Sequence, residues 1–312
     1  MTAFLVRRLV AGVLTLFAIA TISFAVCRFA PGSPFTSEKN VPAEVRRNLE
    51  RKYGFDRPLV VQYGIMMSRY VRGDLGESFQ YRGREVGELV WPGFAVSARL
   101  GAVAFVIAMF FGLALGVTAS KWQNQGPDYA AMSTATLGIC VPNFLLGPLL
   151  VLVFHVWLTW FDPTGWPENW WTWAELKKLV LPACTLAFAH IAYVSRLTRA
   201  GMLDVLHKDF IRTARAKGLS EWSVFLKHGL KNGVTPALTY AGPMAAYIIT
   251  GSVVVEKIFA IPGLGTHFVN SALNRDYSIL MGSILIYSSL VIFFNLLVDL
   301  MYAVLDPRVR MN

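Results

Sequence analysis

The chain contains several apolar segments that are long enough to cross a lipid bilayer. The first, Leu9–Val26, carries no charged residue, and a transmembrane helix needs about 20 predominantly apolar residues. The other segments of this kind are Val96–Ser120, Ala130–Trp160, Leu179–Val194, Val234–Val255 and Ile279–Leu305. We therefore predict an all-α integral membrane protein with six transmembrane helices and both termini on one side of the membrane. In the long third segment we expect a break at Val141-Pro142-Asn143.

The composition agrees with a membrane protein and limits the chemistry. Of the 312 residues, 55% are hydrophobic and 15% are charged, whereas about a quarter are charged in an ordinary soluble domain. The three cysteines, Cys27, Cys140 and Cys184, lie far apart and form no C-x-x-C motif. We expect them to be packing residues, with no disulfide framework and no metal site.

The first apolar segment is either a secretory signal peptide or a retained helix. It is longer than the apolar core of a typical signal peptide, and Cys27–Pro31 is not a small-x-small cleavage site. We expect a retained transmembrane helix over about residues 9–28. In the polar stretch that follows, residues 30–95, apolar side chains recur at roughly helical spacing among charges of both signs. This pattern predicts an external segment of amphipathic helices.

The basic residues predict the orientation of the chain. Lys and Arg gather near the N-terminus, in a long loop over residues 195–233, and in the C-terminal tail. Cytoplasmic loops of membrane proteins carry an excess of these residues, so we predict that both termini and the 195–233 loop are cytoplasmic. The formal net charge of +10 is then a marker of topology, and it does not favour a nucleic-acid partner.

The composition of the 195–233 loop predicts an ordered structure. Apolar residues recur at steps of three and four between Asp209 and His228, among basic residues. Gly218 suits the C′ position of a helix, where a left-handed conformation costs little without a Cβ atom. Ser220 is a candidate N-cap for a second helix. We predict two short helices that meet at this glycine and form a rigid knob.

The same loop resembles a known motif. The segment Arg212-Thr-Ala-Arg-Ala-Lys-Gly218 is similar to the EAA loop of ATP-binding-cassette (ABC) importer permeases, in the version of the peptide and nickel permeases. Other motifs of that family follow in order: Pro31-Gly-Ser-Pro34, Tyr53-Gly-Phe-Asp-Arg-Pro-Leu59, Gly73-Asp-Leu-Gly-Glu-Ser78, Val141-Pro-Asn-Phe-Leu-Leu-Gly147, Leu181-Pro182, Gly251-Ser-Val-Val-Val-Glu256, Ile261-Pro-Gly-Leu-Gly265, Asn274-Arg-Asp-Tyr277 and Leu305-Asp-Pro-Arg308. The chain most resembles an oligopeptide-type ABC importer permease, B subunit. The general importer pattern has Glu-Ala-Ala where this chain has Arg212-Thr213-Ala214, and a proline at Lys231, and both departures look like peptide-permease variants.

The resemblance implies a domain organisation and a set of partners. It implies a type I ABC importer permease fold, with an N-terminal transmembrane helix and periplasmic segment (1–93), a five-helix core that includes the coupling loop (94–305), and a cytoplasmic tail (306–312). The implied location is the bacterial cytoplasmic (inner) membrane, with lipid around the helices. The implied partners are a second permease subunit of the C type, two ATP-binding subunits (D and F type, or a homodimer), and an extracytoplasmic substrate-binding protein.

We expect no catalytic site, cofactor or metal in this chain. The sequence lacks the G-x-x-x-x-G-K-[ST] motif that holds nucleotide phosphates. Residues 30–95 also show no Ser/His/Asp set and no paired histidine ligands. The resemblance therefore assigns ATP, Mg²⁺ and ATP hydrolysis to the partner ATPase subunits, and this chain is not expected to be an enzyme.

The resemblance assigns ATPase coupling to the helix at 209–219. We expect this helix to sit in a groove of an ATPase subunit, with Ala214 and Gly218 allowing close approach. Closure of the ATPase pair would then switch the membrane helices from inward- to outward-facing. The residues assigned to coupling are Phe210, Arg212, Ala214, Arg215, Lys217, Gly218 and Leu219. The alternative is a basic loop that binds anionic lipid.

Polar residues in the apolar spans are candidates for the transport pathway, because burying them in a membrane is costly. These candidates are His190, Asn295 and Asp299, with helix packing as the alternative role. Candidates for docking the binding protein lie at the external end of the fifth span, where a tight re-entrant turn is the alternative: Glu256, Pro262, Gly263 and Gly265. Gly112 and Gly116 form a G-x-x-x-G face, which favours helix packing.

The predicted function is ATP-driven import of peptides, with oligopeptides favoured. Dipeptide, nickel or antimicrobial-peptide cargo stays open, because in this family substrate choice lies largely with the binding protein. A stand-alone secondary transporter or channel is the rival class. Secondary carriers are commonly built from inverted repeats with buried acids, whereas here Asp299 is the only acid predicted within a span and no second half matches the first.

Overall fold

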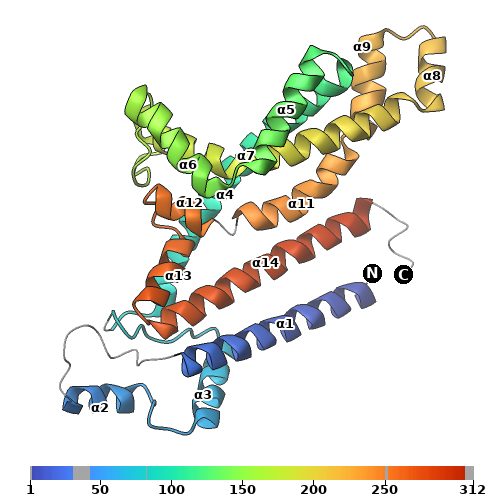
Figure 1. The fold of residues 1–312 in the computed structure, drawn as a ribbon. Coiled ribbons are helices and arrows are strands. Elements are labelled where there is room, and N and C mark those ends of the chain that lie inside the picture. Colours follow the sequence, from blue (N-terminus) through green and yellow to red (C-terminus); the bar gives the residue numbers. More distant parts are fainter. Residues whose placement is uncertain (1, 31–42, 82, 250–251, 306–312) are drawn as a thin grey trace. The chain divides into compact units, whose positions relative to one another are not determined.

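The computed structural model describes residues 2–30, 43–81, 83–249 and 252–305 (Figure 1). Its helices are α1 (Thr2–Phe29), α2 (Ala43–Lys52), α3 (Leu59–Val71), α4 (Val86–Lys121), α5 (Gly126–Cys140), α6 (Asn143–Val151), the π-helix η1 (Leu152–Trp157), α7 (Trp173–Leu206), α8 (Asp209–Ala216), α9 (Glu221–Ser223), the π-helix η2 (Val224–Leu230), α10 (Lys231–Gly233), α11 (Thr235–Ile249), α12 (Val253–Ile258), α13 (Leu264–Leu273) and α14 (Tyr277–Leu305). The chain forms two compact units. Unit 1 comprises Met1–Ser97 and Pro262–Leu296, and unit 2 comprises Ala98–Ile261 and Leu297–Asn312.

The predicted membrane spans are largely present as helices. Four helical segments of the described chain are long and apolar enough to cross a membrane: Val6–Phe29, Val86–Lys121, Trp173–Leu206 and Tyr277–Leu297. A fifth candidate is the pair formed by α5 and the α6–η1 segment, which is bent by 109°. Val141 has an extended backbone at this bend, because a residue before a proline avoids the helical region. The break expected at Val141–Asn143 is thus confirmed.

No single described helix covers the predicted span at Val234–Val255. In the structure α11 covers 15 residues of it, and α12 begins at Val253. Residues 250 and 251, between these two helices, lie outside the described chain. A membrane crossing at Val234–Val255 therefore stays a prediction.

Two helices extend past the predicted boundaries. The second span is predicted to begin at Val96, but α4 begins at Val86. The fourth span is predicted to end at Val194, with a loop from residue 195, but α7 continues as a helix to Leu206. Charged residues such as Arg196 and Arg199 end an apolar segment without ending a helix, since Arg has a high helix propensity. The connection between α7 and α11 is therefore residues 207–234, which we name the helical loop.

Unit 1 is held by contacts among α1, α14 and the segment that follows α1. α1 and α14 lie side by side and antiparallel (Figure 1): Gly12 approaches Ile292, and Phe24 packs in one cluster with Tyr277 and Met281. The expected external segment contains two short helices, α2 and α3. Tyr63 of α3 places its hydroxyl 2.8 Å from that of Thr21 in α1.

Asp276 joins two segments that are far apart in the sequence. Its buried carboxylate accepts hydrogen bonds from the Ser78 hydroxyl and from the backbone N–H groups of Phe79 and Gln80, at 3.3 and 3.2 Å. It also accepts from the N–H of Ile279 at 3.2 Å, as an N-cap of α14 does. Two of the family-like motifs, at 73–78 and 274–277, therefore meet at one carboxylate.

Unit 2 is organised around α7. A Cβ atom added to Gly112 of α4 would lie 2.6 Å from Val194, and one added to Gly116 would lie 2.5 Å from the Ser195 carbonyl oxygen. On α5, a Cβ atom at Gly138 would lie 2.9 Å from Ala192. The G-x-x-x-G face of α4 thus packs closely against α7, as small residues do between membrane helices.

We predict that Gly116→Ala destabilises the protein by about 1–3 kcal/mol, because the added methyl group has no room beside Ser195. Gly64→Ala is the matched control, since among the described atoms nothing lies within 4 Å of a Cβ atom there. Alanine is the better helix former, so this change is expected to be neutral or stabilising. Thermal unfolding in detergent measures both variants, and equal midpoints would contradict the close packing of α4 on α7.

We also predict that Asp276→Ala destabilises unit 1, because the buried Ser78 hydroxyl and the buried Ile279 N–H lose their acceptor, at a cost of about 1–3 kcal/mol for each unsatisfied group. The N–H groups of Phe79 and Gln80 are less buried and add less. Asp56→Ala removes an exposed carboxylate in the same unit and is expected to change stability by about 0.5 kcal/mol or less. Proteolysis of the external segment, compared between the two variants, provides the measurement. Similar cleavage rates in both would show that the Asp276 contacts do not hold this segment.

Candidate functional site

The helical loop is the candidate site on which the sequence motifs concentrate. It contains α8, α9, η2 and α10, and in Figure 1 α8 is drawn at the end of α7. The two short helices that the sequence predicted are present, although the second is a single α-helical turn that continues as a π-helix.

Gly218 forms the turn between the two parts of the loop. Its φ of +79° lies in the left-handed region. The N–H of Gly218 donates to the Arg215 carbonyl at 2.9 Å, and the N–H of Leu219 donates to the Ala214 carbonyl at 3.4 Å. These two bonds form a Schellman motif, which satisfies carbonyl groups at the end of α8. The C′ position predicted for Gly218 is confirmed.

Side chains fix the other side of this turn. The Ser220 hydroxyl accepts a hydrogen bond from the N–H of Ser223 at 3.4 Å and so caps α9, as predicted. The Arg215 guanidinium donates to both carboxylate oxygens of Glu221, at 2.9 and 3.2 Å. Both side chains are exposed, so this pair contributes only about 0–1 kcal/mol. Its bidentate geometry nevertheless links α8 to α9 across the glycine.

Ala214 faces the interior of the loop. It is 6% exposed and packs in a small apolar cluster with Val205, Ile211 and Val224. The sequence analysis expected Ala214 to allow a partner to approach closely, but the structure places it against its own chain. Helical spacing puts Ile211 and Ala214 on one face of α8, and α7 and η2 cover that face.

The helical loop exposes both apolar and basic side chains. We name the exposed apolar set the outer face, and its members are Phe210, Leu219, Trp222 and Leu226. Arg212 and Lys217, also assigned to coupling from the sequence, are exposed as well. Four large apolar side chains exposed on one short loop are candidates for contact with a partner.

The loop is attached closely to α7. A Cβ atom at Gly201 of α7 would collide with the carbonyl oxygen of Gly233 and lie 3.0 Å from Pro236. A Cβ atom at Gly233 would lie 2.5 Å from the sulfur of Met202. The end of the loop and the end of α7 therefore touch through backbone atoms, which allows little independent movement.

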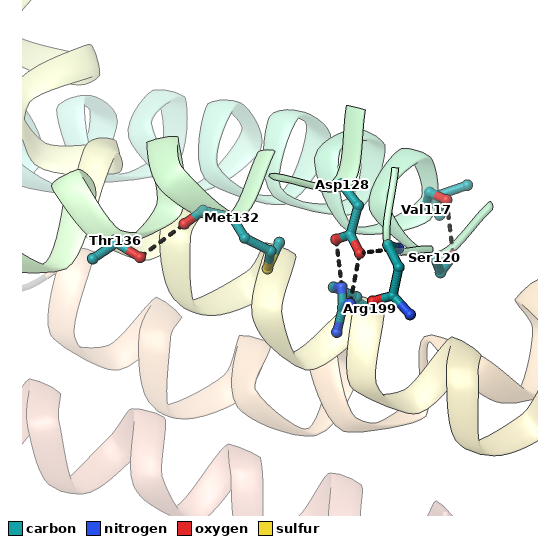
Figure 2. A network of polar contacts seen from close by, with 7 residues as sticks. Val117, Ser120, Asp128, Met132, Thr136 and Arg199 are labelled. Atoms are coloured by element: carbon teal, nitrogen blue, oxygen red, sulfur yellow. Dashed lines mark hydrogen bonds and ion pairs between the residues drawn. The ribbon is translucent and has the colours of Figure 1, made fainter. Parts of the chain in front are cut away.

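An ion pair near the loop, buried at its acidic end, was not predicted from the sequence. Asp128, in the first turn of α5, binds Arg199 of α7 through two contacts of 2.6 Å (Figure 2). Arg199 was counted only as a loop cation, and Asp128 was not singled out. The two residues are 71 positions apart, so no local sequence pattern connects them. The only signal in the sequence is an acidic residue, Asp128, at the edge of an apolar span.

The pathway candidates lie in different surroundings. The Nδ1 atom of His190 lies 3.0 Å from the Tyr240 hydroxyl, and its ring centroid lies 5.6 Å from that of Tyr247. His190 is thus buried and hydrogen-bonded, as its packing alternative expects. Asn295 is exposed on α14. The side chain of Asp299 lies outside the described residues, so a pathway role stays a prediction for all three.

The docking candidates do not form one surface. Glu256 is fully buried at 0% exposure in unit 2, so its side chain does not face an external protein. Pro262 is exposed in unit 1, whereas Gly263 and Gly265 are buried there. Ala260 has a φ of +52°, and the N–H of Ile261 donates to the Glu256 carbonyl at 2.8 Å, which agrees with the tight-turn alternative. Only Pro262 of this set has the exposure that docking requires.

Among the described residues no group of three or more His, Cys, Asp or Glu side chains is arranged to hold a metal ion. The cysteines are unpaired thiols, with Cys27 buried and Cys140 exposed.

Comparisons with known proteins cover the whole chain. The profile of binding-protein-dependent transport system inner membrane components matches residues 88–311, and the N-terminal profile of such membrane components matches residues 1–110. The oligopeptide transport system permease protein OppB of Escherichia coli (strain K12) is 44% identical over 310 residues, which are 99% of this chain and 100% of that protein. The dipeptide transport system permease protein DppB of Bacillus subtilis (strain 168) is 42% identical over 312 residues, which are 100% of this chain and 99% of that protein.

Solved structures share the fold. The MetNI methionine ABC transporter in an inward-facing conformation gives a TM-score of 0.57 at 14% identity, over 70% of this chain and 96% of that chain. An amino acid ABC transporter solved with histidines gives a TM-score of 0.52 at 17% identity, over 69% and 92% of the two chains. At these identities the likeness concerns the fold alone.

Proposed function

The chain belongs to the family of binding-protein-dependent transport system inner membrane components and is a permease of the ABC peptide-importer type, and from this premise we propose that it carries oligopeptides across the bacterial inner membrane by alternating access. The observation that carries the proposal is the full-length similarity to oligopeptide permeases, at 43–44% identity. The chain receives its cargo from an external binding protein. It works beside a second permease subunit of the C type.

The proposed topology follows the sequence analysis. Residues 1–93 hold the first transmembrane helix and a periplasmic segment, residues 94–305 hold the core, and residues 306–312 are a cytoplasmic tail. The termini and the helical loop face the cytoplasm. The antiparallel arrangement of α1 and α14 supports termini on one side.

ATP hydrolysis belongs to two partner ATPase subunits, because this sequence has no phosphate-binding motif of the G-x-x-x-x-G-K-[ST] type. The helical loop docks on them through its outer face, with Phe210 and Leu219 entering an apolar groove. Arg212 and Lys217 meet acidic groups at the rim. Ala214 packs on the inner side of α8 against Val205 and Val224, and Gly218 forms the turn between α8 and α9.

The lipid-anchor alternative for the loop is less well supported. Arg215 pairs with Glu221, Arg212 with Asp209, and Lys208 with Asp204. These acids reduce the net positive field that anionic lipid needs. Exposed Trp222 and Leu226 add an apolar surface, which a protein groove would bury.

The coupling path runs from the loop into the membrane through α7. Closure of the ATPases displaces α8, and the close contact of Gly201 with Gly233 passes this displacement to α7. Because Gly112 and Gly116 of α4 lie against α7, α4 moves with it. Such rigid-body movement of packed helices is a common form of transport switching.

The test of this function is uptake by the complete complex in proteoliposomes. The complex contains this chain, the second permease, both ATPases and the binding protein. We expect labelled oligopeptide to accumulate only when ATP is present, and labelled dipeptide and Ni²⁺ to accumulate much less. Accumulation of dipeptide or Ni²⁺ in preference to oligopeptide would assign the cargo to the alternative members of the family.

We predict that Gly218→Val lowers ATP-dependent uptake about tenfold while the protein still inserts and assembles. A left-handed conformation costs a β-branched residue about 1–2 kcal/mol, and 1.4 kcal/mol is a factor of ten. Gly218→Asn is the matched variant, because asparagine tolerates this conformation. If Asn retains uptake, the turn is what matters, and if it loses uptake as well, the glycine is needed for close approach of the ATPase. Normal uptake by both variants would contradict a coupling role for Gly218.

A further inference from the structure

The ion pair between Asp128 and Arg199 has the geometry of a rigid link. The Nε and Nη2 atoms of Arg199 each lie 2.6 Å from one carboxylate oxygen of Asp128 (Figure 2). The Asp128 side chain is 3% exposed and that of Arg199 is 25% exposed. Bidentate pairs of this kind fix orientation as well as distance, so the start of α5 and the end of α7 are held in one arrangement.

The same carboxylate also holds the turn between α4 and α5. The N–H of Asn124 donates to Oδ2 of Asp128 at 2.9 Å, and Asn124 has a φ of +58°. An asparagine tolerates this left-handed conformation. Asp128 therefore contacts the turn on one side and α7 on the other.

The residue just before this turn contacts the helical loop. The Nζ atom of Lys121, at the end of α4, lies 4.0 Å from the ring centroid of Trp222 in α9. A cation this close to an indole face is attracted to it. Lys121, on one side of the turn, thus contacts the helical loop, and Asp128, on the other side, contacts α7.

Other contacts keep α5 on α7 without the ion pair. Gly138 of α5 packs on Ala192 and Phe188 of α7, and the Arg196 guanidinium donates to the Thr136 hydroxyl at 2.8 Å. These contacts lie farther along both helices, toward the bend at Val141. The ion pair is therefore positioned to control the end of α5 nearest the helical loop.

We propose that Asp128 and Arg199 are positioning residues that make α5 follow α7 when the helical loop moves. The proposal rests on the proposed coupling function of that loop. The pair stays formed through the transport cycle, so that displacement of the loop reaches the bent α5–α6 segment as well as α4. Without the pair, α7 moves and the start of α5 lags behind.

The experiment uses the complete importer complex in proteoliposomes and measures peptide uptake and ATP hydrolysis on the same sample. The variants are Asp128→Asn, which is isosteric, and Arg199→Gln. Glu175→Gln is the matched control, because Glu175 pairs with Lys178 at the opposite end of α7. We expect peptide taken up per ATP hydrolysed to fall about tenfold in both test variants and to stay unchanged in the control.

Two further variants separate positioning from folding. Arg199→Lys keeps the charge and loses the bidentate contact, so we expect an intermediate ratio of uptake to hydrolysis. The double variant Asp128→Asn with Arg199→Gln is expected to be no worse than either single variant, because partners in one link are not additive.

The proposal is overturned if the ratio of uptake to hydrolysis matches the wild type in Asp128→Asn and Arg199→Gln. It is also overturned if uptake and hydrolysis fall together in proportion to the amount of assembled complex, since that result indicates a structural role only. Failure of the proposed function is recognised separately, because the wild-type complex would then show no ATP-dependent peptide uptake.

Discussion

The close approach of neighbouring backbones to α7 is the contact on which the rest of unit 2 depends. Between membrane helices the lipid is as apolar as the side chains, so association relies on close packing of small residues. Here Gly112, Gly116 and Gly138 of two helices meet α7 along its length, and Gly201 of α7 meets the helical loop at its end. A methyl group at any of these positions would lie within 3 Å of its neighbour. This packing makes α7 a common support for α4, α5 and the loop.

Because α7 contacts α4, α5 and the helical loop, a movement of the loop can reach the other helices of unit 2. The outer face can be recognised by a partner only if the loop keeps its shape, and the glycine turn, the Ser220 cap and the Arg215–Glu221 pair maintain that shape. The loop can move the membrane helices only if it is fastened to them. Close packing provides the fastening at Gly201, and the Asp128–Arg199 pair adds a charged link at the start of α5.

Local features of the sequence predicted the local structure of the loop but not its long-range contacts. Gly218 and Ser220 act within a few residues, so their turn and cap positions were confirmed. The side that Ala214 faces depends on Val205 and Val224, which come from neighbouring elements. The Asp128–Arg199 pair joins residues 71 positions apart, and α7 extends past the charges that end its apolar segment. The buried position of Glu256 likewise depends on contacts that no spacing in the sequence reveals.

The central claim is that the helical loop and α7 move as one body during transport. It can be tested by measuring a distance between two spin labels, one replacing exposed Ala216 on α8 and one replacing exposed Trp173 at the far end of α7, in the full complex without its native cysteines. The account predicts one narrow distance distribution that is the same in the resting complex and with a non-hydrolysable ATP analogue bound. A shift or a clear broadening of that distribution on binding the analogue would contradict it.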